Sequence, residues 1–383
     1  MSSSPKTLSS YWVLVFLFYF LTHAMIRAAM GWNLTADEVD LIRNTGSFEF
    51  LYDGEMPLYT WLQISVFDLF GKTIFAMTLL KNAIMLMITM SIFTLVQKAA
   101  NREFAFAAAV SLLFVPQIIW TSQHSLTAPV LATLFAATSL LAFYRLWEGV
   151  TLRRYMMLGA MLGLGAISSI SFLVVPVALV GAALLSKKTR ALILNKFFLA
   201  TIVITVAVAI RPYQEMMSTG VLSFGTDLTA TSIYQRVIDL YATLQTVLTF
   251  LSLLIVGTTI IVYSGLGEAR TTPQPLLNLR EFILRMSFIG IILIFGYAFV
   301  EGGREISKST IQPILFLVAP LIALYVYPVM NQPSFKNARN LSGIVAVLIL
   351  IVTPMYFSFE KGLGSNALQA AVTDSPTGAS VQN

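Results

Sequence analysis

The chain of 383 residues contains no cysteine and only two histidines. The lack of thiols excludes disulfides and thiolate metal sites, and two histidines are too few for a dedicated transition-metal centre. Charge is also scarce: 11% of the residues are charged, against roughly 25% in ordinary soluble domains. With 57% hydrophobic residues and a mean hydropathy of +0.80, the composition excludes a soluble globular protein and indicates an integral membrane protein.

Apolar stretches recur from one end of the chain to the other. A membrane-spanning helix needs about 20 mostly apolar residues, and the pattern predicts about eleven such spans. Residues 155–186 exceed one crossing, so we divide them at the serines of 168–171. The first span is too long and too aromatic for a cleaved signal peptide, and we expect a retained helix. The predicted spans are 11–29, 73–96, 104–120, 127–147, 155–170, 171–186, 197–210, 242–264, 284–300, 310–329 and 341–358.

The basic residues predict the orientation of these spans. With a cytoplasmic N-terminus, fifteen of the 24 basic residues lie on the inner side, as the positive-inside rule requires. Fourteen of the 18 acidic residues then lie on the outer side. The net charge of +6 is thus a signature of topology, and we expect no nucleic-acid partner.

Chemistry has to come from the spans and their outer loops, because no other segment is large enough to fold alone. The longest outer segment is 30–72, whereas 359–383 is small, polar and poor in aromatics and is predicted to be disordered. The absence of an internal repeat gives no sign of the duplicated halves that many transporters have.

The first outer loop carries an acidic pair. Thr35 and Glu38 have the spacing of a capping box, which predicts a short helix beginning at about Ala36. Asp37 and Glu38 would point about 100° apart on that helix, so both cannot face one reacting atom. Glu38 is either a cap or a second functional acid. Asp37 has no capping duty and is a candidate general base, because a carboxylate beside an apolar bundle has a raised pKa.

The same loop continues with YDGEMPLYTWL at 52–62. Pro57 fits the first turn of a second short helix, and Tyr59 and Trp61 suit the headgroup level of a membrane. Taken alone, these residues favour an interfacial aromatic belt that performs no chemistry.

A few cations and one histidine complete the set of candidates. Lys81 lies about two turns inside a span, where it is either a functional charge or a side chain that snorkels to the interface. Arg304 and Lys308 are four residues apart in one outer loop, and Arg211 follows the seventh span; each has the alternative of a solvated loop cation. His124 lies in a short outer turn, where it is either a hydrogen-bonding residue or part of the site.

The order of these pieces resembles the lipid-linked sugar transferases of the GT-C class. The outer acidic pair followed by Pro57-Leu58-Tyr59-Thr60-Trp61-Leu62 is similar to glycosyltransferase family 39, which includes protein O-mannosyltransferases and bacterial lipid A aminoarabinose transferases. Bacterial members often have a second proline at the position of Met56. Further similarities are Lys81, the segments 122–127 and 159–165, and the stretch 304–313 before a helix with Pro320.

The resemblance implies an all-α, GT-C-like bundle over 1–358, with 30–72 as the outer catalytic loop, in a bacterial inner membrane. It implies transfer from a polyprenyl-phosphate sugar to a lipid, polysaccharide or protein acceptor on the non-cytoplasmic face. Asp37 would be the base, and Glu38 would cap the helix or position the acceptor. The donor phosphate would bind Lys81, Arg304, Lys308 and Arg211; the sugar or acceptor would contact His124, Tyr59 and Trp61. No cofactor is required, although the outer acids could hold a divalent cation.

Two other classes of protein stay open. A transporter or glycolipid flippase would place ionisable residues at mid-membrane on broken helices, whereas here the acids concentrate in outer loops. A non-catalytic assembly subunit would not depend on Asp37. Because the chain has no segment that resembles a large soluble outer domain, we expect a lipid or polysaccharide acceptor more than a protein.

Overall fold

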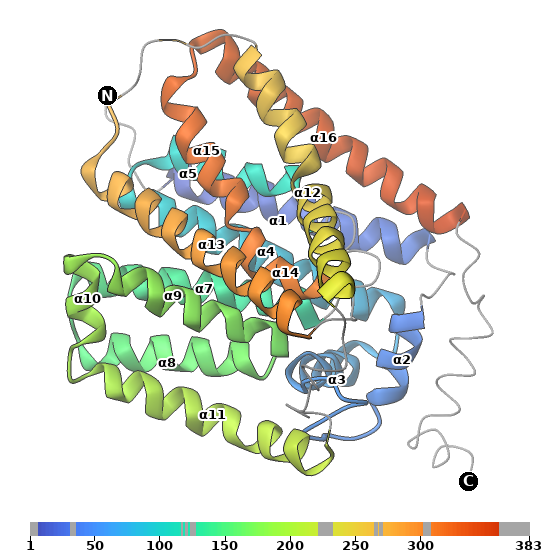
Figure 1. Ribbon diagram of the computed structural model, residues 1–383. Coiled ribbons are helices and arrows are strands. Elements are labelled where there is room, and N and C mark those ends of the chain that lie inside the picture. Colours follow the sequence, from blue (N-terminus) through green and yellow to red (C-terminus); the bar gives the residue numbers. More distant parts are fainter. Residues whose placement is uncertain are drawn as a thin grey trace.

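The computed structural model describes residues 7–30, 36–115, 118, 122, 128–220, 233–263, 267, 271–301 and 308–359. Within these ranges the chain is mostly helical, and an isolated bridge joins Tyr52 and Glu55. The predicted tail lies outside the described residues except for Phe359. Figure 1 shows a bundle of long helices with the short helices α2 and α3 together at one end.

Helices make up most of the described part of the chain. Their bounds are α1 Thr7–Met30, α2 Ala36–Asn44, α3 Leu58–Phe70, α4 Ile74–Ala99, α5 Arg102–Val110, η1 Ser111–Phe114, α7 Ala128–Glu148, α8 Leu152–Ala166, η3 Ile170–Leu173, α9 Val174–Leu184, α10 Lys187–Ile193, α11 Phe198–Ser218, α12 Ile233–Tyr263, α13 Gln274–Glu301, α14 Lys308–Leu315, α15 Val318–Val326, η4 Tyr327–Val329 and α16 Gln332–Phe359.

Each predicted span coincides with a helix or with two consecutive helices, which confirms the polytopic membrane fold. Seven stretches in the described part of the chain are long and apolar enough to cross a membrane. The other four predicted spans correspond to α5 with η1, to α8, to α9 and to α16. The number of eleven crossings is therefore not established. α8 has 15 residues and a length of about 22 Å, which is less than the roughly 30 Å of a hydrocarbon core.

The division of the long apolar stretch near residue 168 is confirmed. α8 ends at Ala166, and the turn that follows contains Ser168, whose hydroxyl donates to the carbonyl of Gly165. Ser169 then caps η3, because its hydroxyl accepts from the backbone N–H of Ser171. Serine side chains that satisfy backbone groups locally favour a turn over a continuous helix.

The predicted end of the seventh span before Arg211-Pro212 is wrong. α11 continues through Pro212 to Ser218. A proline inside a helix removes one backbone hydrogen bond, which usually ends or kinks the helix. Here the next residue, Tyr213, links α11 to α8, because its hydroxyl donates to the carbonyl of Ala166 at 3.2 Å. Arg211 therefore lies on an exposed face of a helix and does not lie at its end.

Glycines allow α8 and α11 to pack closely. A Cβ atom added to Gly159 would lie 2.6 Å from the carbonyl oxygen of Thr201, and one added to Gly163 would lie 2.8 Å from the Cβ of Val208. The hydroxyl of Thr201 donates across this contact to the carbonyl of Tyr155. Small residues spaced four apart, with threonine hydroxyls bridging the backbones, are the usual means by which membrane helices associate.

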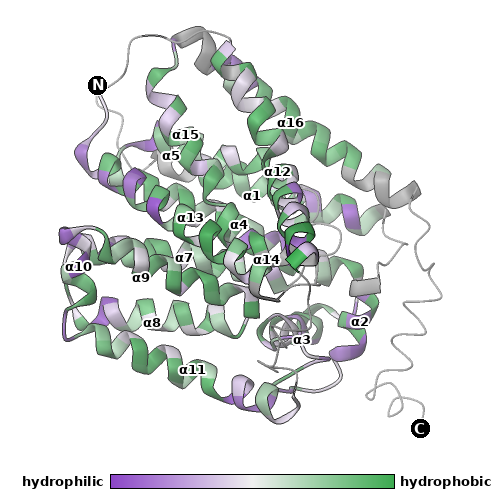
Figure 2. Cartoon of the chain, in the orientation of Figure 1, coloured by the Kyte–Doolittle hydropathy of each residue, from purple (hydrophilic) through white to green (hydrophobic). Residues whose placement is uncertain are grey.

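Polar residues gather at the two ends of the bundle, while its middle is apolar (Figure 2). At the end that carries α2 and α3, the N–H of Leu58 donates to the carbonyl of Ile167. At the opposite end, Lys98 pairs with Glu148 at 2.9 Å, and the hydroxyl of Tyr327 donates to Glu103. Residues predicted to share a membrane side thus lie at the same end of the bundle.

Candidate active site

The candidate site lies at the α2–α3 end of the bundle. α2 begins at Ala36, as the sequence predicts, so Asp37 and Glu38 are in its first turn. Thr35 and the side chain of Asp37 lie outside the described part of the structure, and the capping box is not tested. The two short outer helices expected from the sequence are therefore present, with an acidic pair at the start of the first.

Glu38 forms a buried ion pair with Arg27 from the last turn of α1. The Nη2 atom of Arg27 lies 3.4 Å from Oε2 of Glu38, and each side chain is only 4% exposed. A charge that is buried away from water is costly unless an opposite charge lies beside it, so the two side chains depend on each other. The pair therefore ties the start of α2 to the end of the first span, a contact that the sequence analysis missed. The one signal was an arginine inside an apolar helix, which is rare without a partner or a function.

The segment between α2 and α3 is folded by hydrogen bonds of two aromatic residues. The hydroxyl of Tyr52 donates to the carbonyl of Ser47, and the indole N–H of Trp61 donates to the carbonyl of Glu49 at 2.7 Å. Asp53 and Gly54, both with positive φ, form the tight turn between Tyr52 and Glu55. Asp-Gly is a preferred pair for such a turn because both positions have left-handed backbones.

α3 begins directly after Pro57, as predicted, and buries two polar side chains on one face. Tyr59 is 2% exposed, and its hydroxyl has no hydrogen-bond partner among the described residues. Burial and then the negative charge of Glu38 raise the pKa of the Tyr59 phenol above its ordinary value. Gln63, one turn further on, is fully buried, and in the described part of the chain neither its amide oxygen nor its amide nitrogen has a hydrogen-bond partner.

These two unpartnered groups single out the face of α3 that carries them. A buried donor or acceptor left without a partner costs about 1–3 kcal/mol, so such groups are rare in native proteins and call for an explanation. A ligand rich in hydroxyl groups would satisfy both. Gln63 was not predicted, because a lone glutamine in an apolar helix has no sequence signature.

Lys81 lies deeper in the bundle, on α4. It is 3% exposed, and the neighbouring Asn82 donates to the carbonyl of Thr78. The hydroxyl of Thr78 lies 3.5 Å from the carbonyl of Ala24, and Phe16 meets Phe93 further along, so α1 and α4 run antiparallel. Arg27 lies three residues from Ala24 toward the α2–α3 end, and Lys81 lies three residues from Thr78 away from that end. At about 1.5 Å per helical residue, Lys81 is therefore about 9 Å deeper in the bundle than Arg27.

The remaining predicted site residues are not brought together by the described contacts. His124 and Arg304 lie outside the described residues, as does the side chain of Lys308, whose backbone begins α14. Arg211 is exposed on α11, and Trp61 is half-buried, with its N–H used within the loop. Among the side chains that the structure describes, no group of three or more histidine and acidic residues could hold a metal ion.

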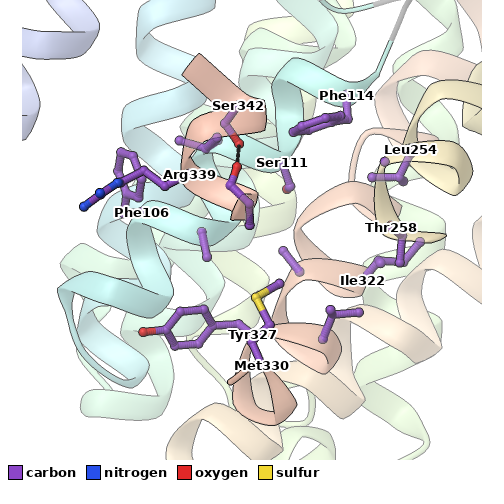
Figure 3. Close-up of a pocket in the computed structure, with 16 residues that line it drawn as sticks. Phe106, Ser111, Phe114, Leu254, Thr258, Ile322, Tyr327, Met330, Arg339 and Ser342 are labelled. Carbon is purple, nitrogen blue, oxygen red and sulfur yellow. Dashed lines mark hydrogen bonds between the residues drawn. The ribbon is translucent and has the colours of Figure 1, made fainter. Parts of the chain in front are cut away.

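Two apolar cavities lie away from the acidic pair. The larger, about 400 Å³, is bounded by α1, α4, α5 and α16 and begins one turn beyond Lys81, at Met85. The smaller, about 70 Å³, lies between α5, α12, α15 and α16 (Figure 3). Both reach the opposite end of the bundle, where Phe106 and Arg339 line each of them.

Sequence comparisons connect this arrangement to known proteins. Residues 55–213 match the family described as dolichyl-phosphate-mannose-protein mannosyltransferase. The lipopolysaccharide core galacturonosyltransferase RgtB of Rhizobium johnstonii is 23% identical over 87% of this chain and 68% of its own length. RgtA from the same organism, also a lipopolysaccharide core galacturonosyltransferase, is 29% identical over 54% of this chain and 41% of its own length.

These matches confirm the predicted resemblance to glycosyltransferase family 39 of the GT-C class.

Solved structures show that this glycosyltransferase has the GT-C fold. ArnT from Cupriavidus metallidurans bound to undecaprenyl phosphate covers 96% of the chain, with a TM-score of 0.58 and 14% identity; the match spans 75% of that protein. The oligosaccharyltransferase of Archaeoglobus fulgidus covers 98% of the chain, with a TM-score of 0.54 and 15% identity, over 59% of its own length. At these identities the likeness concerns the fold alone. The sequence relatives, the apolar helices and this fold together confirm the prediction of a multi-pass membrane glycosyltransferase.

Proposed function

We propose that this glycosyltransferase moves a sugar from a polyprenyl-phosphate donor to a hydroxyl of a glycolipid or glycan acceptor at the α2–α3 end of the bundle. The observation that carries the proposal is the depth order of the buried charges. The Arg27–Glu38 pair includes the residue that follows Asp37 in α2, and a buried cation, Lys81, lies about 9 Å deeper than Arg27. In a polyprenyl-phosphate sugar the phosphate joins the sugar to the lipid. The reaction therefore needs a base on the solvent side of the sugar and a cation on its lipid side.

The reaction is a displacement at the anomeric carbon. Asp37 accepts the proton of the acceptor hydroxyl, and the oxygen of that hydroxyl forms the new bond to the anomeric carbon. The bond from that carbon to the donor phosphate breaks, and its electron pair leaves with the polyprenyl phosphate. Lys81 stabilises the charge of the leaving phosphate, and burial makes this interaction stronger than it would be in water. The Arg27–Glu38 pair holds the first turn of α2, and hence Asp37, against α1.

Tyr59 and Gln63 are assigned to the sugar. Their buried hydroxyl and amide groups lack hydrogen-bond partners, so the hydroxyl groups of a bound sugar would supply them. Arg304, Lys308 and Arg211 are assigned to the phosphate and its surroundings, and His124 and Trp61 to the acceptor, as family resemblance implies. The reaction as written needs no metal ion or other cofactor.

The relatives suggest which sugar and acceptor to test first. Both RgtA and RgtB are named as lipopolysaccharide core galacturonosyltransferases. A polyprenyl-phosphate galacturonic acid and a lipopolysaccharide core are therefore the first donor and acceptor for this protein. The positive-inside rule favours the non-cytoplasmic side for the α2–α3 end, which would be the periplasmic face of a bacterial inner membrane.

Membranes that contain the protein, supplied with polyprenyl-phosphate galacturonic acid and lipopolysaccharide core, test the proposal. Mass spectrometry should find the acceptor heavier by one sugar residue with the wild type and unchanged with Asp37→Asn. Cysteine scanning of the loops with a membrane-impermeant thiol reagent checks the orientation, because the native chain contains no cysteine. Sugar transfer that persists in Asp37→Asn would disprove the assigned base.

A further inference from the structure

The larger apolar cavity has a cation at the end remote from the active site. Its lining runs from His23 to Trp12 on α1, and eleven residues of helix correspond to about 16 Å. Arg339 of α16 also lines the cavity, and its guanidinium lies beside Phe106 (Figure 3), whose ring centroid is 4.2 Å from that of Trp12. Lys81, the cation assigned to the donor phosphate, is not among the lining residues. The cavity is thus matched to a ligand whose charge lies at the Trp12 end.

The surroundings of Arg339 are those of a lipid headgroup site. Arg339 is exposed, and it has no hydrogen bond or ion pair within the described structure. It stands where α16 changes from polar to apolar residues: Lys336 and Asn340 are exposed near it, and the apolar run begins at Leu341. An arginine at such a boundary keeps its head at the interface while its stem covers apolar surface. Arg339 is predicted to lie on the cytoplasmic side, where basic pockets between membrane helices bind anionic lipid headgroups.

The second cavity points to a ligand with two chains. Arg339, Phe106, Val110 and Ser342 line both cavities, so the arginine stands between them. Figure 3 shows its guanidinium beside Phe106, directed away from the smaller cavity. The volume of about 400 Å³ suits one acyl chain, whereas about 70 Å³ holds only part of another. A polyprenyl phosphate has a single chain, and the proposed function assigns its phosphate to Lys81, which does not line either cavity.

We propose that the cavity between α1, α4, α5 and α16 binds an anionic diacyl phospholipid, with its phosphate on Arg339 and one acyl chain reaching toward His23. The bound lipid occupies the interior space that begins one turn beyond Lys81, at Met85. It would come from the leaflet opposite to the α2–α3 end.

Fluorescence of the full-length protein in nanodiscs tests this site. Trp12 lines the cavity, so a bromine-labelled acyl chain inside it should quench Trp12. The quenching is measured with brominated phosphatidylglycerol and with brominated phosphatidylcholine in an unlabelled phosphatidylcholine background. Trp12→Phe identifies the contribution of Trp12 among the five tryptophans. We expect stronger quenching by the anionic lipid, and Arg339→Gln should reduce it to the level of phosphatidylcholine.

A glycine allows a matched variant that blocks the acyl chain of the lipid and leaves the charge of Arg339 unchanged. Gly343 lines the cavity, and a Cβ atom added there meets nothing within 4 Å, so Gly343→Leu should fill the cavity and lower quenching by both lipids. Gly296 on α13 is equally open but lines neither cavity, and Gly296→Leu should behave as the wild type.

Three results would overturn the proposal. They are equal quenching by the two lipids, a preference that survives Arg339→Gln, and unchanged quenching in Gly343→Leu. Relief of quenching by added undecaprenyl phosphate would instead assign the cavity to the donor lipid.

Discussion

Arg27 and Glu38 join the last turn of the first span to the first turn of α2, with 3.4 Å between Nη2 and Oε2. Both side chains are buried. Asp37, the predicted base, directly precedes Glu38 in the first turn of α2. The position of the base therefore depends on an ion pair that is itself excluded from water.

Removal of one partner of this pair should destabilise the protein. Arg27→Met leaves a buried carboxylate without its cation, and breaking a buried pair in this way costs about 3–5 kcal/mol. The double variant Arg27→Met/Glu38→Met should recover most of that loss, because two apolar side chains need no compensation. Thermal unfolding in detergent measures both. A double variant no more stable than Arg27→Met would contradict the assigned pairing.

Asp37→Asn should reduce sugar transfer roughly 100- to 10,000-fold, which is the usual contribution of a general base. The variant should fold and insert normally. Asp40 provides the control, since it lies on the same helix but is exposed and pairs with Arg43 at 3.4 Å. Asp40→Asn should transfer sugar like the wild type in the same assay. If both variants lose activity equally, α2 needs its negative charge in general and Asp37 has no special role.

Lys81→Ala should weaken use of the donor. A charge-assisted hydrogen bond contributes about 1.5–3 kcal/mol, so the KM for the polyprenyl-phosphate sugar should rise at least about tenfold. Lys81→Arg should retain part of the activity, while Lys188→Ala, an exposed lysine on α10, serves as a charge-matched control. Unchanged donor saturation in Lys81→Ala would remove the residue from the phosphate site.

Gln63→Leu should have opposite effects on stability and on activity. The substitution removes two buried polar atoms that lack partners, so the ligand-free protein should be more stable by about 1–3 kcal/mol. Sugar transfer should fall, because the bound sugar loses its hydrogen bonds to the amide. Calorimetry and the transfer assay on one preparation check both effects, with exposed Gln214→Leu as the control. A variant that is less stable and fully active would show that Gln63 has a purely structural role.

Gly159→Ala should loosen the contact between α8 and α11. The new Cβ would lie 2.6 Å from a backbone oxygen of Thr201, which cannot rotate away, and overpacking of this kind costs about 1–3 kcal/mol. Gly296→Ala meets nothing within 4 Å and should instead gain up to about 1 kcal/mol of helix propensity. Thermal unfolding of the two variants should therefore shift in opposite directions. A stabilised Gly159→Ala would mean that the two helices can separate without cost.

Some boundaries could be predicted because they depend on residues close together in the sequence. The spacing of Thr35 and Glu38 predicts the start of α2, Pro57 predicts that of α3, and the serines of 168–171 predict the break after Ala166. The end of α11 could not be predicted in this way. Pro212 is a local signal to stop, but the hydrogen bond from Tyr213 to Ala166 joins residues 47 apart and holds the helix together.

The sequence by itself determined that this protein is a polytopic membrane protein, that its polar segments divide between two ends, and which family its outer loop resembles. These features rest on composition, on helical periodicity and on short motifs, all of which act over a few neighbouring residues. Only the tertiary structure decided that Glu38 pairs with Arg27, that Tyr59 and Gln63 are buried without partners, and that Arg339 stands beside an apolar cavity. Such contacts depend on how the helices pack, and no local pattern specifies which side chains will meet.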